Sequence, residues 1–330
     1  MERDLYWDSL KCVLIFFVVY GHIIEVDYPI GSFNRAMYNF IYTFHMPLFI
    51  FISGRFSHIR DRQKYKKNIL RLFETYVIFQ VLLTIVSIAH GGEFNIDFLT
   101  MPNWILWYLL ALIYWRITIY LVPKRWLQHQ KYMIIASLAI CLLGGFIPVG
   151  PHFVVQRTLS SLPFFVLGYY SINYNITKYI DKIPVIATII VLVLTFAFLY
   201  FMLNRNLNFV VNGSLPYRLD NYIHTLMHIG ARCLFIPIAI IIGSMIMRLT
   251  PTNATLARWG SVTMFIYIYH SIAVLFLYIA INRYIIPNNE FLLFIYGIIV
   301  TLCMIYLSRI RYFNVLLNPI SYFYNNHKKH

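Results

Sequence analysis

The sequence predicts an all-α fold, a polytopic membrane bundle of about ten transmembrane helices with both termini in the cytoplasm. Composition is the first reason: 60% of the 330 residues are hydrophobic and 12% are charged. Soluble domains average about 45–50% apolar and about 25% charged residues, so this chain has too little charge to cover a water-facing surface. The same figures exclude intrinsic disorder, collagen, a disulfide scaffold and a nucleic-acid-binding domain. The second reason is a series of apolar segments near the length of about 20 residues that a spanning helix needs.

These segments are continuous apolar runs, without the alternation that is typical of transmembrane barrel strands. The predicted helices cover residues 10–26, 38–54, 72–89, 103–122, 131–147, 155–172, 184–203, 224–248, 259–281 and 291–309. The fifth and sixth are short and contain Gly144, Gly145 and Pro163. No repeat of 20–50 residues and no loop of domain length is present, so residues 1–330 are expected to form a single membrane domain.

Basic residues determine the predicted orientation. With a cytoplasmic N-terminus, 21 of the 27 Lys and Arg residues fall in cytoplasmic segments and 5 in external ones. Cytoplasmic loops carry such an excess of positive charge, which also accounts for the net charge of +15. The N-terminus lacks a small-residue cleavage site, so we expect the first apolar segment to be a retained helix. The four cysteines lie inside apolar segments and are interpreted as buried small residues.

The first predicted helix contains several ionisable residues in an otherwise apolar segment. Lys11 and His22 are eleven residues apart, about three turns plus roughly 20°, so they share a helix face at a separation of about 16 Å along the axis. Glu25 follows His22 at i+3 and can reach its ring, and Asp8 precedes Lys11 by three residues and can hold its ammonium group. Because ionisable groups inside a membrane are costly, they usually mark functional sites.

This spacing suits a long substrate with an anionic end and a reactive end. Lys11 at the cytoplasmic end would hold phosphate, and His22 farther in would act as a general base because imidazole titrates near neutral pH. The alternative is structural: Lys11 as an interfacial anchor and His22 as a hydrogen-bonding residue inside the bundle.

His45 precedes Pro47 in the second helix, where the proline frees a backbone carbonyl and requires a cavity or partner nearby. His45 is therefore expected to face the bundle interior, either at a functional site or at a structural kink. The following loop holds seven basic residues from Arg55 to Arg71. The excess of basic residues in cytoplasmic loops explains most of this charge. Lys67 and Arg71, near the helix end, are also candidates for contact with a polyanionic cofactor.

Trp107 and Tyr108 open the fourth helix at its predicted outer end. They fit an interfacial aromatic belt or, alternatively, a groove whose aromatic faces stack on sugar rings. Arg232 lies about two turns into the eighth helix, where it needs an anionic partner; Glu25, Glu74 or a substrate phosphate are the candidates.

Other histidines lie deep in the predicted helices. His224 and His228 have the i, i+4 spacing of a zinc pair, but no glutamate follows His224 and no third ligand is evident, so no metal site is predicted. His270, at the end of Tyr267-Ile268-Tyr269-His270, places another imidazole within the membrane.

Together these residues resemble the acyltransferase type 3 family of integral membrane O-acyltransferases, which includes bacterial polysaccharide O-acetyltransferases. The resemblance spans almost the whole chain. It rests on the order and spacing of Arg3-Asp4, Trp7 to Lys11, Lys11-x10-His22, Phe44 to Phe49, Ser53-Gly54, Leu106 to Leu109 and Tyr267 to His270. The family often has Arg-x-x-Arg before the third helix, whereas the nearest arrangement here is Lys67-x3-Arg71.

The resemblance implies transfer of an acyl group, usually acetyl from acetyl-CoA, to a hydroxyl of a glycan or lipid-linked glycan at a bacterial plasma membrane. It implies that His22 is the catalytic histidine and that Lys11 contacts or orients the cofactor. His22, assisted by Glu25, would deprotonate the acceptor hydroxyl or carry an acetyl group itself. A proton-coupled transporter or flippase is the competing class, although no inverted repeat is found.

Overall fold

The computed structural model describes residues 4–25, 29, 31–89, 96–149, 152–201, 216–218, 220–282 and 289–317. Helices and short 3₁₀ turns make up the regular structure of these residues, and no strand occurs among them. The α-helices are α1 (Leu5–Ile24), α2 (Phe33–Arg55), α3 (Arg62–Ala89), α4 (Trp107–Leu121), α5 (Lys124–Leu127), α6 (Gln130–Leu143), α7 (Val155–Tyr170), α8 (Ile176–Ile180), α9 (Val185–Phe201), α11 (Tyr222–Leu249), α12 (Ala254–Gly260), α13 (Thr263–Asn282), α14 (Glu290–Leu307) and α15 (Arg311–Val315).

Each of the ten predicted segments overlaps a helix of the structure. In the described part of the chain, seven helical segments are long and apolar enough to cross a membrane, and residues 130–146 and 185–201 form shorter apolar helices. The helix α7, which corresponds to the predicted sixth span, has 16 residues and is not among these seven segments. Several apolar helices thus support a multi-pass membrane protein, while the number of ten spans and the cytoplasmic position of both termini stay predictions.

The largest boundary difference is at α3, which begins at Arg62 rather than near residue 72. The side chain of Asp61 accepts hydrogen bonds from the backbone N–H groups of Gln63 and Lys64 at 2.8 and 3.0 Å. These bonds satisfy donors of the first turn, as an N-cap does. Hydropathy located only the apolar part of this helix, because seven of its first ten residues, Arg71 among them, have basic or amide side chains.

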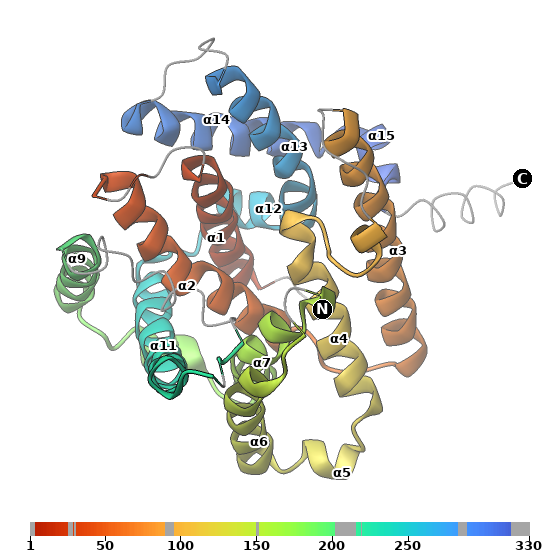
Figure 1. The fold of residues 1–330 in the computed structure, drawn as a ribbon, viewed down its shortest axis with the longest axis vertical. Helices are drawn as coiled ribbons and strands as arrows, with labels where there is room; N and C mark the ends of the chain where they lie inside the picture. Colours follow the sequence, from red (N-terminus) through yellow and green to blue (C-terminus); the bar gives the residue numbers. More distant parts are fainter. Residues whose placement is uncertain are drawn as a thin grey trace, which may run out of the picture.

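The helix α1 lies inside the bundle, in contact with α2, α12, α13 and α14 (Figure 1). Leu10, Leu14, Val19, Ile23 and Ile24 on this helix are fully buried. A helix that is apolar on nearly all sides belongs in a protein interior. The polar residues of α1 are therefore held by packing from several directions.

Glycines bring two pairs of helices into close contact. A Cβ atom at Gly54 of α2 would collide with the carbonyl of Phe165 on α7, and one at Gly168 of α7 would collide with the carbonyl of Phe51 on α2. At Gly260 of α12, it would collide with the Asp8 carbonyl of α1. Small residues permit this close backbone approach between membrane helices. Gly54 of the Ser53-Gly54 motif thus has a packing role.

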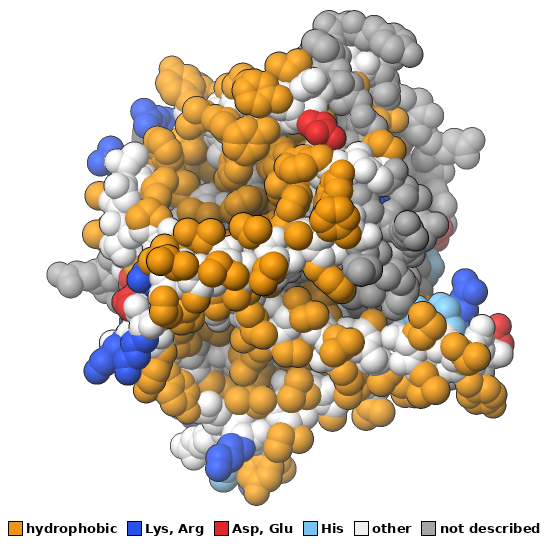
Figure 2. Space-filling model, turned by 90° about the vertical axis from the view of Figure 1, so that its left-hand side faces the viewer, with side chains coloured by type: hydrophobic (Ala, Val, Ile, Leu, Met, Phe, Trp, Pro, Cys, Tyr) orange, Lys and Arg blue, Asp and Glu red, His pale blue; other side chains and the backbone are white. Residues whose placement is uncertain are grey.

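Hydrophobic side chains dominate the face of the molecule in Figure 2, and the Lys and Arg side chains lie at its margins. The helix α9 is an example: Ile186, Val193, Leu194, Phe198 and Phe201 are 58–73% exposed. A soluble protein rarely exposes an apolar surface of this extent. The distribution matches a protein surrounded by lipid.

Candidate functional site

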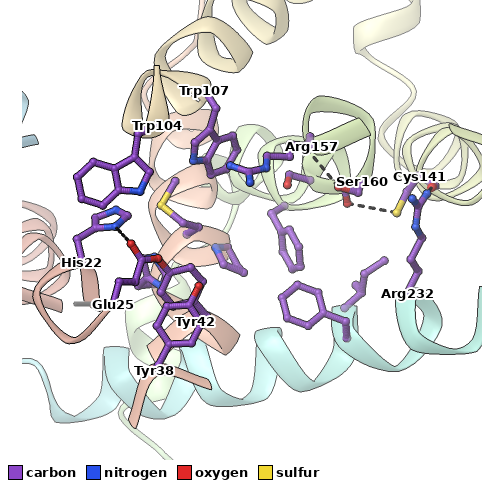
Figure 3. Close-up of a pocket in the computed structure, with 17 residues that line it drawn as sticks. His22, Glu25, Tyr38, Tyr42, Trp104, Trp107, Cys141, Arg157, Ser160 and Arg232 are labelled. Atoms are coloured by element: carbon purple, nitrogen blue, oxygen red, sulfur yellow. Dashed lines mark hydrogen bonds and ion pairs between the residues drawn. The ribbon is translucent and has the colours of Figure 1, made fainter. Parts of the chain in front are cut away.

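A cavity of about 170 Å³ lies among α1, α2, α7 and α11 and the turn that precedes α4. Figure 3 shows His22 and Glu25 at one end, Trp107 and Arg157 in the middle, and Arg232 at the other end. We call this the His22 cavity. Its polar, aromatic and charged lining includes His22, Glu25, Tyr38, Tyr42, His45, Trp104, Trp107, Arg157, Ser160, Ser161 and Arg232.

The predicted contact between His22 and Glu25 is present. The Nδ1 atom of His22 lies 3.0 Å from Oε2 of Glu25, and the Tyr42 hydroxyl donates to Oε1 of Glu25 at 2.5 Å. With Glu25 as a carboxylate, the Nδ1–H must be the donor, which leaves a lone pair on Nε2. This is the arrangement of an oriented general base, in which a carboxylate fixes both the ring and its tautomer.

Aromatic rings enclose His22. The ring centroids of His22 and Trp104 are 4.6 Å apart, and those of His22 and His270 are 5.3 Å apart with 27° between their planes. The Nδ1–H of His270 donates to the carbonyl of Ile266 at 3.0 Å. His270 is fully buried, and its Nε2 has no hydrogen-bond partner among the residues that the structure describes. It packs behind His22 rather than among the residues that line the cavity.

His45 faces the bundle interior, as its position before Pro47 predicted. It is 2% exposed, and its Nδ1–H donates to the carbonyl of Ile41 at 2.7 Å. His45 and Trp107 both line the His22 cavity. Tyr108 is not among the lining residues; its hydroxyl shares a 2.5 Å hydrogen bond with Ser53. Of the two neighbouring aromatic residues, Trp107 is thus placed to contact a ligand in this cavity.

Arg232 is 2% exposed and lies at the end of the cavity away from His22. Its guanidinium donates to the carbonyl of Cys141 at 2.7 Å and to the side-chain oxygen of Gln156 at 3.2 Å. It also lies over the Tyr217 ring, 4.8 Å from the centroid. These contacts fix the guanidinium beside the cavity through uncharged groups of α6 and α7.

The other three predicted cofactor-binding residues lie elsewhere. Lys11 forms the predicted ion pair with Asp8 at 2.5 Å and lies 5.7 Å from the Phe56 ring centroid. Lys67 and Arg71 are exposed on the first turns of α3. None of the three is among the lining residues of the His22 cavity. Their role in cofactor binding stays a prediction.

The residues of the cavity that the sequence analysis did not predict include Tyr38, Tyr42, Trp104 and Arg157. Trp104 lies in the predicted fourth helix, three residues before Trp107, and Arg157 is one of the five basic residues counted as external. Tyr42 precedes His45 by three residues and so shares its helix face, which was a usable signal. The contact of Tyr42 with Glu25 joins α2 to the end of α1, and sequence spacing alone does not show such a contact.

Two larger cavities lie next to one another in the direction of the predicted cytoplasmic side, and each shares lining residues with its neighbour. An apolar cavity of about 560 Å³, which we call the middle cavity, shares Pro47 and Phe164 with the His22 cavity. A polar cavity of about 640 Å³, the vestibule, shares Tyr174 and Ile176 with the middle cavity. The vestibule is lined by two basic and two acidic residues among others: Arg55, Arg248, Asp4 and Asp181.

His224 and His228 stack on each other, with 4.1 Å between their ring centroids. In the part of the chain that the structure describes, no group of three or more His, Cys, Asp or Glu residues is placed to hold a metal ion.

Comparison with known proteins gives one match. A family profile described as an acyltransferase domain matches residues 4–309. No curated protein and no solved structure matches the chain. The matched region covers nearly all of the 330 residues and includes every element that lines the His22 cavity. The chain therefore belongs to the acyltransferase type 3 family, a family of membrane acyltransferases.

Proposed function

We propose that this protein is a membrane-embedded O-acyltransferase that moves an acyl group, acetyl in the simplest case, from acyl-CoA to a hydroxyl of a cell-surface or lipid-linked glycan. One observation carries the proposal. The imidazole of His22 is held by Glu25 at 3.0 Å, and both residues line a cavity inside a helical membrane bundle. Membership of the acyltransferase family supplies the reaction class.

The proposed reaction uses His22 as general base. Its Nε2 takes the proton from the acceptor hydroxyl while the hydroxyl oxygen attacks the carbonyl carbon of the thioester. The carbon–sulfur bond breaks, and the departing thiolate of CoA takes that proton from the imidazolium. Glu25 stabilises the imidazolium through the Nδ1–H bond, and Tyr42 holds the other carboxylate oxygen. Transfer through an acyl-His22 intermediate uses the same groups and remains the alternative route.

The row of three adjacent cavities supports entry of the donor from the cytoplasm. In this proposal the phosphates of CoA bind in the vestibule near Arg55 and Arg248, which both line it. The pantetheine arm crosses the middle cavity and delivers the thioester to the His22 cavity through the region of Pro47 and Phe164. Lys11 lines none of these three cavities, and it stays a candidate for orienting the nucleotide end of the donor.

The acceptor is proposed to enter the His22 cavity past Trp104 and Trp107. Trp104 is 46% exposed and packs against the His22 ring, with 4.6 Å between centroids. Aromatic faces of this kind stack on sugar rings. A hydroxyl of a bound sugar would then lie beside Nε2 of His22.

The decisive experiment measures free CoA released by the purified protein in lipid nanodiscs, with acetyl-CoA and a glycan acceptor. The His22→Ala variant is expected to lose about 10²–10⁴-fold in rate, the contribution of a general base. His129→Ala is the matched control, because His129 is exposed on the short segment between α5 and α6. Full activity of His22→Ala would refute the mechanism, and absence of thioester consumption by the wild type would favour a transporter or flippase.

Mass spectrometry of surface glycans from cells with and without the gene identifies the transferred group and its carrier. A mass increase of one acetyl group per modified sugar is expected only when the wild-type chain is present. The same glycans should be unmodified in cells that carry His22→Ala.

A further inference from the structure

The charges that line the His22 cavity are unequal. Among its lining residues, Arg157 and Arg232 are cationic and Glu25 is anionic. Both oxygens of Glu25 are already engaged, one by His22 and the other by Tyr42. Figure 3 places the two guanidinium groups away from this carboxylate, in the middle and at the far end of the cavity. A ligand that fills this region would meet a positive field.

Arg157 provides the accessible cation. Its guanidinium lies over the Trp107 ring, 5.1 Å from the centroid, and its side chain is exposed although it lines a cavity. Cation–π stacking holds the group in one position and leaves its N–H donors for a ligand. In the described residues, no ion pair joins Arg157 to a carboxylate. The planar fork of arginine matches a carboxylate or phosphate.

The backbone before Arg157 is strained. Phe153 and Val154 have φ angles of 52° and 51°, a left-handed conformation that is unfavourable for side chains of this size. The backbone N–H of Phe153 donates to the Thr100 carbonyl at 2.6 Å, and the Thr100 hydroxyl lies 2.8 Å from Nδ1 of His152. These contacts hold the start of α7, whose first turn carries Gln156 and Arg157. Strain of this kind is typical of ligand sites.

Arg232 adds a second cation from α11. Gln156, the residue before Arg157, accepts one of its hydrogen bonds at 3.2 Å. The turn that positions Arg157 therefore also positions Arg232. The carbonyl oxygen of Cys141 and the side-chain oxygen of Gln156 orient the Arg232 guanidinium at the wall of the cavity.

We propose that the His22 cavity binds an anionic group of a reactant, a carboxylate or phosphate, with Arg157 as its principal ligand and Arg232 as the second cation. This inference rests on the proposed function and deepens it, because it assigns the acceptor to acidic sugars such as uronic acids or phosphorylated sugars. Trp107 contacts the sugar face while Arg157 binds the acid, and the reacting hydroxyl lies at His22. The same chemistry would fit the terminal carboxylate of a dicarboxylic acyl donor.

Binding is tested without donor, by saturation-transfer NMR on the wild-type protein in nanodiscs. The probes are methyl β-D-glucuronide and methyl β-D-glucoside, which differ only in the carboxylate. We expect the glucuronide to bind about 10- to 100-fold more tightly, the range that one charge-assisted hydrogen bond supplies. Arg157→Gln should remove this difference, and Arg157→Lys should retain part of it. Arg258→Gln, at an exposed position on α12, is the control that should retain all of it.

The donor arm compares succinyl-CoA with acetyl-CoA in the CoA-release assay. If the anionic group belongs to the donor, Arg157→Gln lowers kcat/KM for succinyl-CoA about 10- to 100-fold more than it lowers kcat/KM for acetyl-CoA, while the two glycosides bind alike. Either pattern supports the anion site and identifies its source. The anion site is refuted if the wild type neither binds the glucuronide more tightly than the glucoside nor uses succinyl-CoA more efficiently than Arg157→Gln does. It is also refuted if Arg157→Gln keeps the wild-type preference for the anionic probe.

Failure of the proposed function has a different signature. In that case the wild type releases no CoA with any acceptor, yet the glucuronide preference and its loss in Arg157→Gln still report the anion site directly. Circular dichroism and thermal unfolding of each variant show whether Arg157→Gln is folded. Arg157→Lys provides the folded comparison if it is not.

Discussion

The two ends of α1 carry the same pairing of a basic residue with an acid three positions away, but their surroundings differ. Near the N-terminus, Lys11 pairs with Asp8 at 2.5 Å, and Phe56 is its aromatic neighbour. Near the C-terminus, His22 pairs with Glu25 at 3.0 Å at the wall of a cavity. Side chains from three other helical segments converge there: Tyr42, Trp104 and His270.

The difference shows that a pair of charges on a helix indicates chemistry only when the rest of the fold leaves room for a ligand. The ammonium group of Lys11 is held by the carboxylate of Asp8 and lines none of the three cavities. The His22 pair is oriented by its acid, and its second ring nitrogen remains available for proton transfer. Substitutions at each end should therefore have different consequences.

The largest effect in this comparison is expected for Glu25→Gln. The amide keeps the size of the side chain but removes the negative charge that stabilises the imidazolium and selects the ring tautomer. We expect kcat to fall about 10²–10³-fold with little change in KM for the donor. Steady-state CoA release measures both constants. Unchanged kcat would show that the His22–Glu25 contact is structural.

A smaller effect is expected for Tyr42→Phe, which removes the hydroxyl that donates to Glu25 at 2.5 Å. A hydrogen bond to a charged group contributes about 1.5–3 kcal/mol, so kcat should fall about 10- to 100-fold. In a double-mutant cycle with Glu25→Gln, the two losses should be less than additive. Additive losses would indicate that Tyr42 acts on the substrate independently of Glu25.

At the other end of α1, Lys11→Met should act on donor binding rather than on chemistry. Removal of the ammonium is expected to raise the KM for acetyl-CoA about two- to tenfold, since one partly solvated charge contributes little. The value of kcat should stay unchanged. Asp8→Asn is the matched control, because it breaks the same ion pair and retains the cation. If KM is unchanged in Lys11→Met, the residue is only an anchor.

The smallest effect is expected for Lys67→Gln and Arg71→Gln. Both side chains are exposed on α3, where water and salt screen their charges. The KM for acetyl-CoA should change less than about twofold at an ionic strength of 0.15 M. A larger change at either position would place the nucleotide end of the donor beside α3 instead of in the vestibule.

Local spacing was sufficient to predict several contacts of the site. The i+3 separations of His22 from Glu25 and of Lys11 from Asp8 predicted contacts that the structure contains, because residues three apart are neighbours on any α-helix. Pro47 predicted an interior position for His45, which is buried. By contrast, the contribution of Arg157 depended on a strained turn before α7, which no hydropathy pattern encodes.

The sequence by itself determined the membrane class, the apolar helical segments and the acyltransferase family, because composition, segment length and motif order are properties of the chain alone. The tertiary structure decided which polar residues meet in one cavity. Glycines at the α2–α7 contact set how closely these helices approach, and that approach brings Tyr42 and Arg157 toward residues far away in the sequence. Helix periodicity fixes the direction in which a side chain points around the axis of its helix. Which residues that side chain contacts depends on how the helices pack against one another.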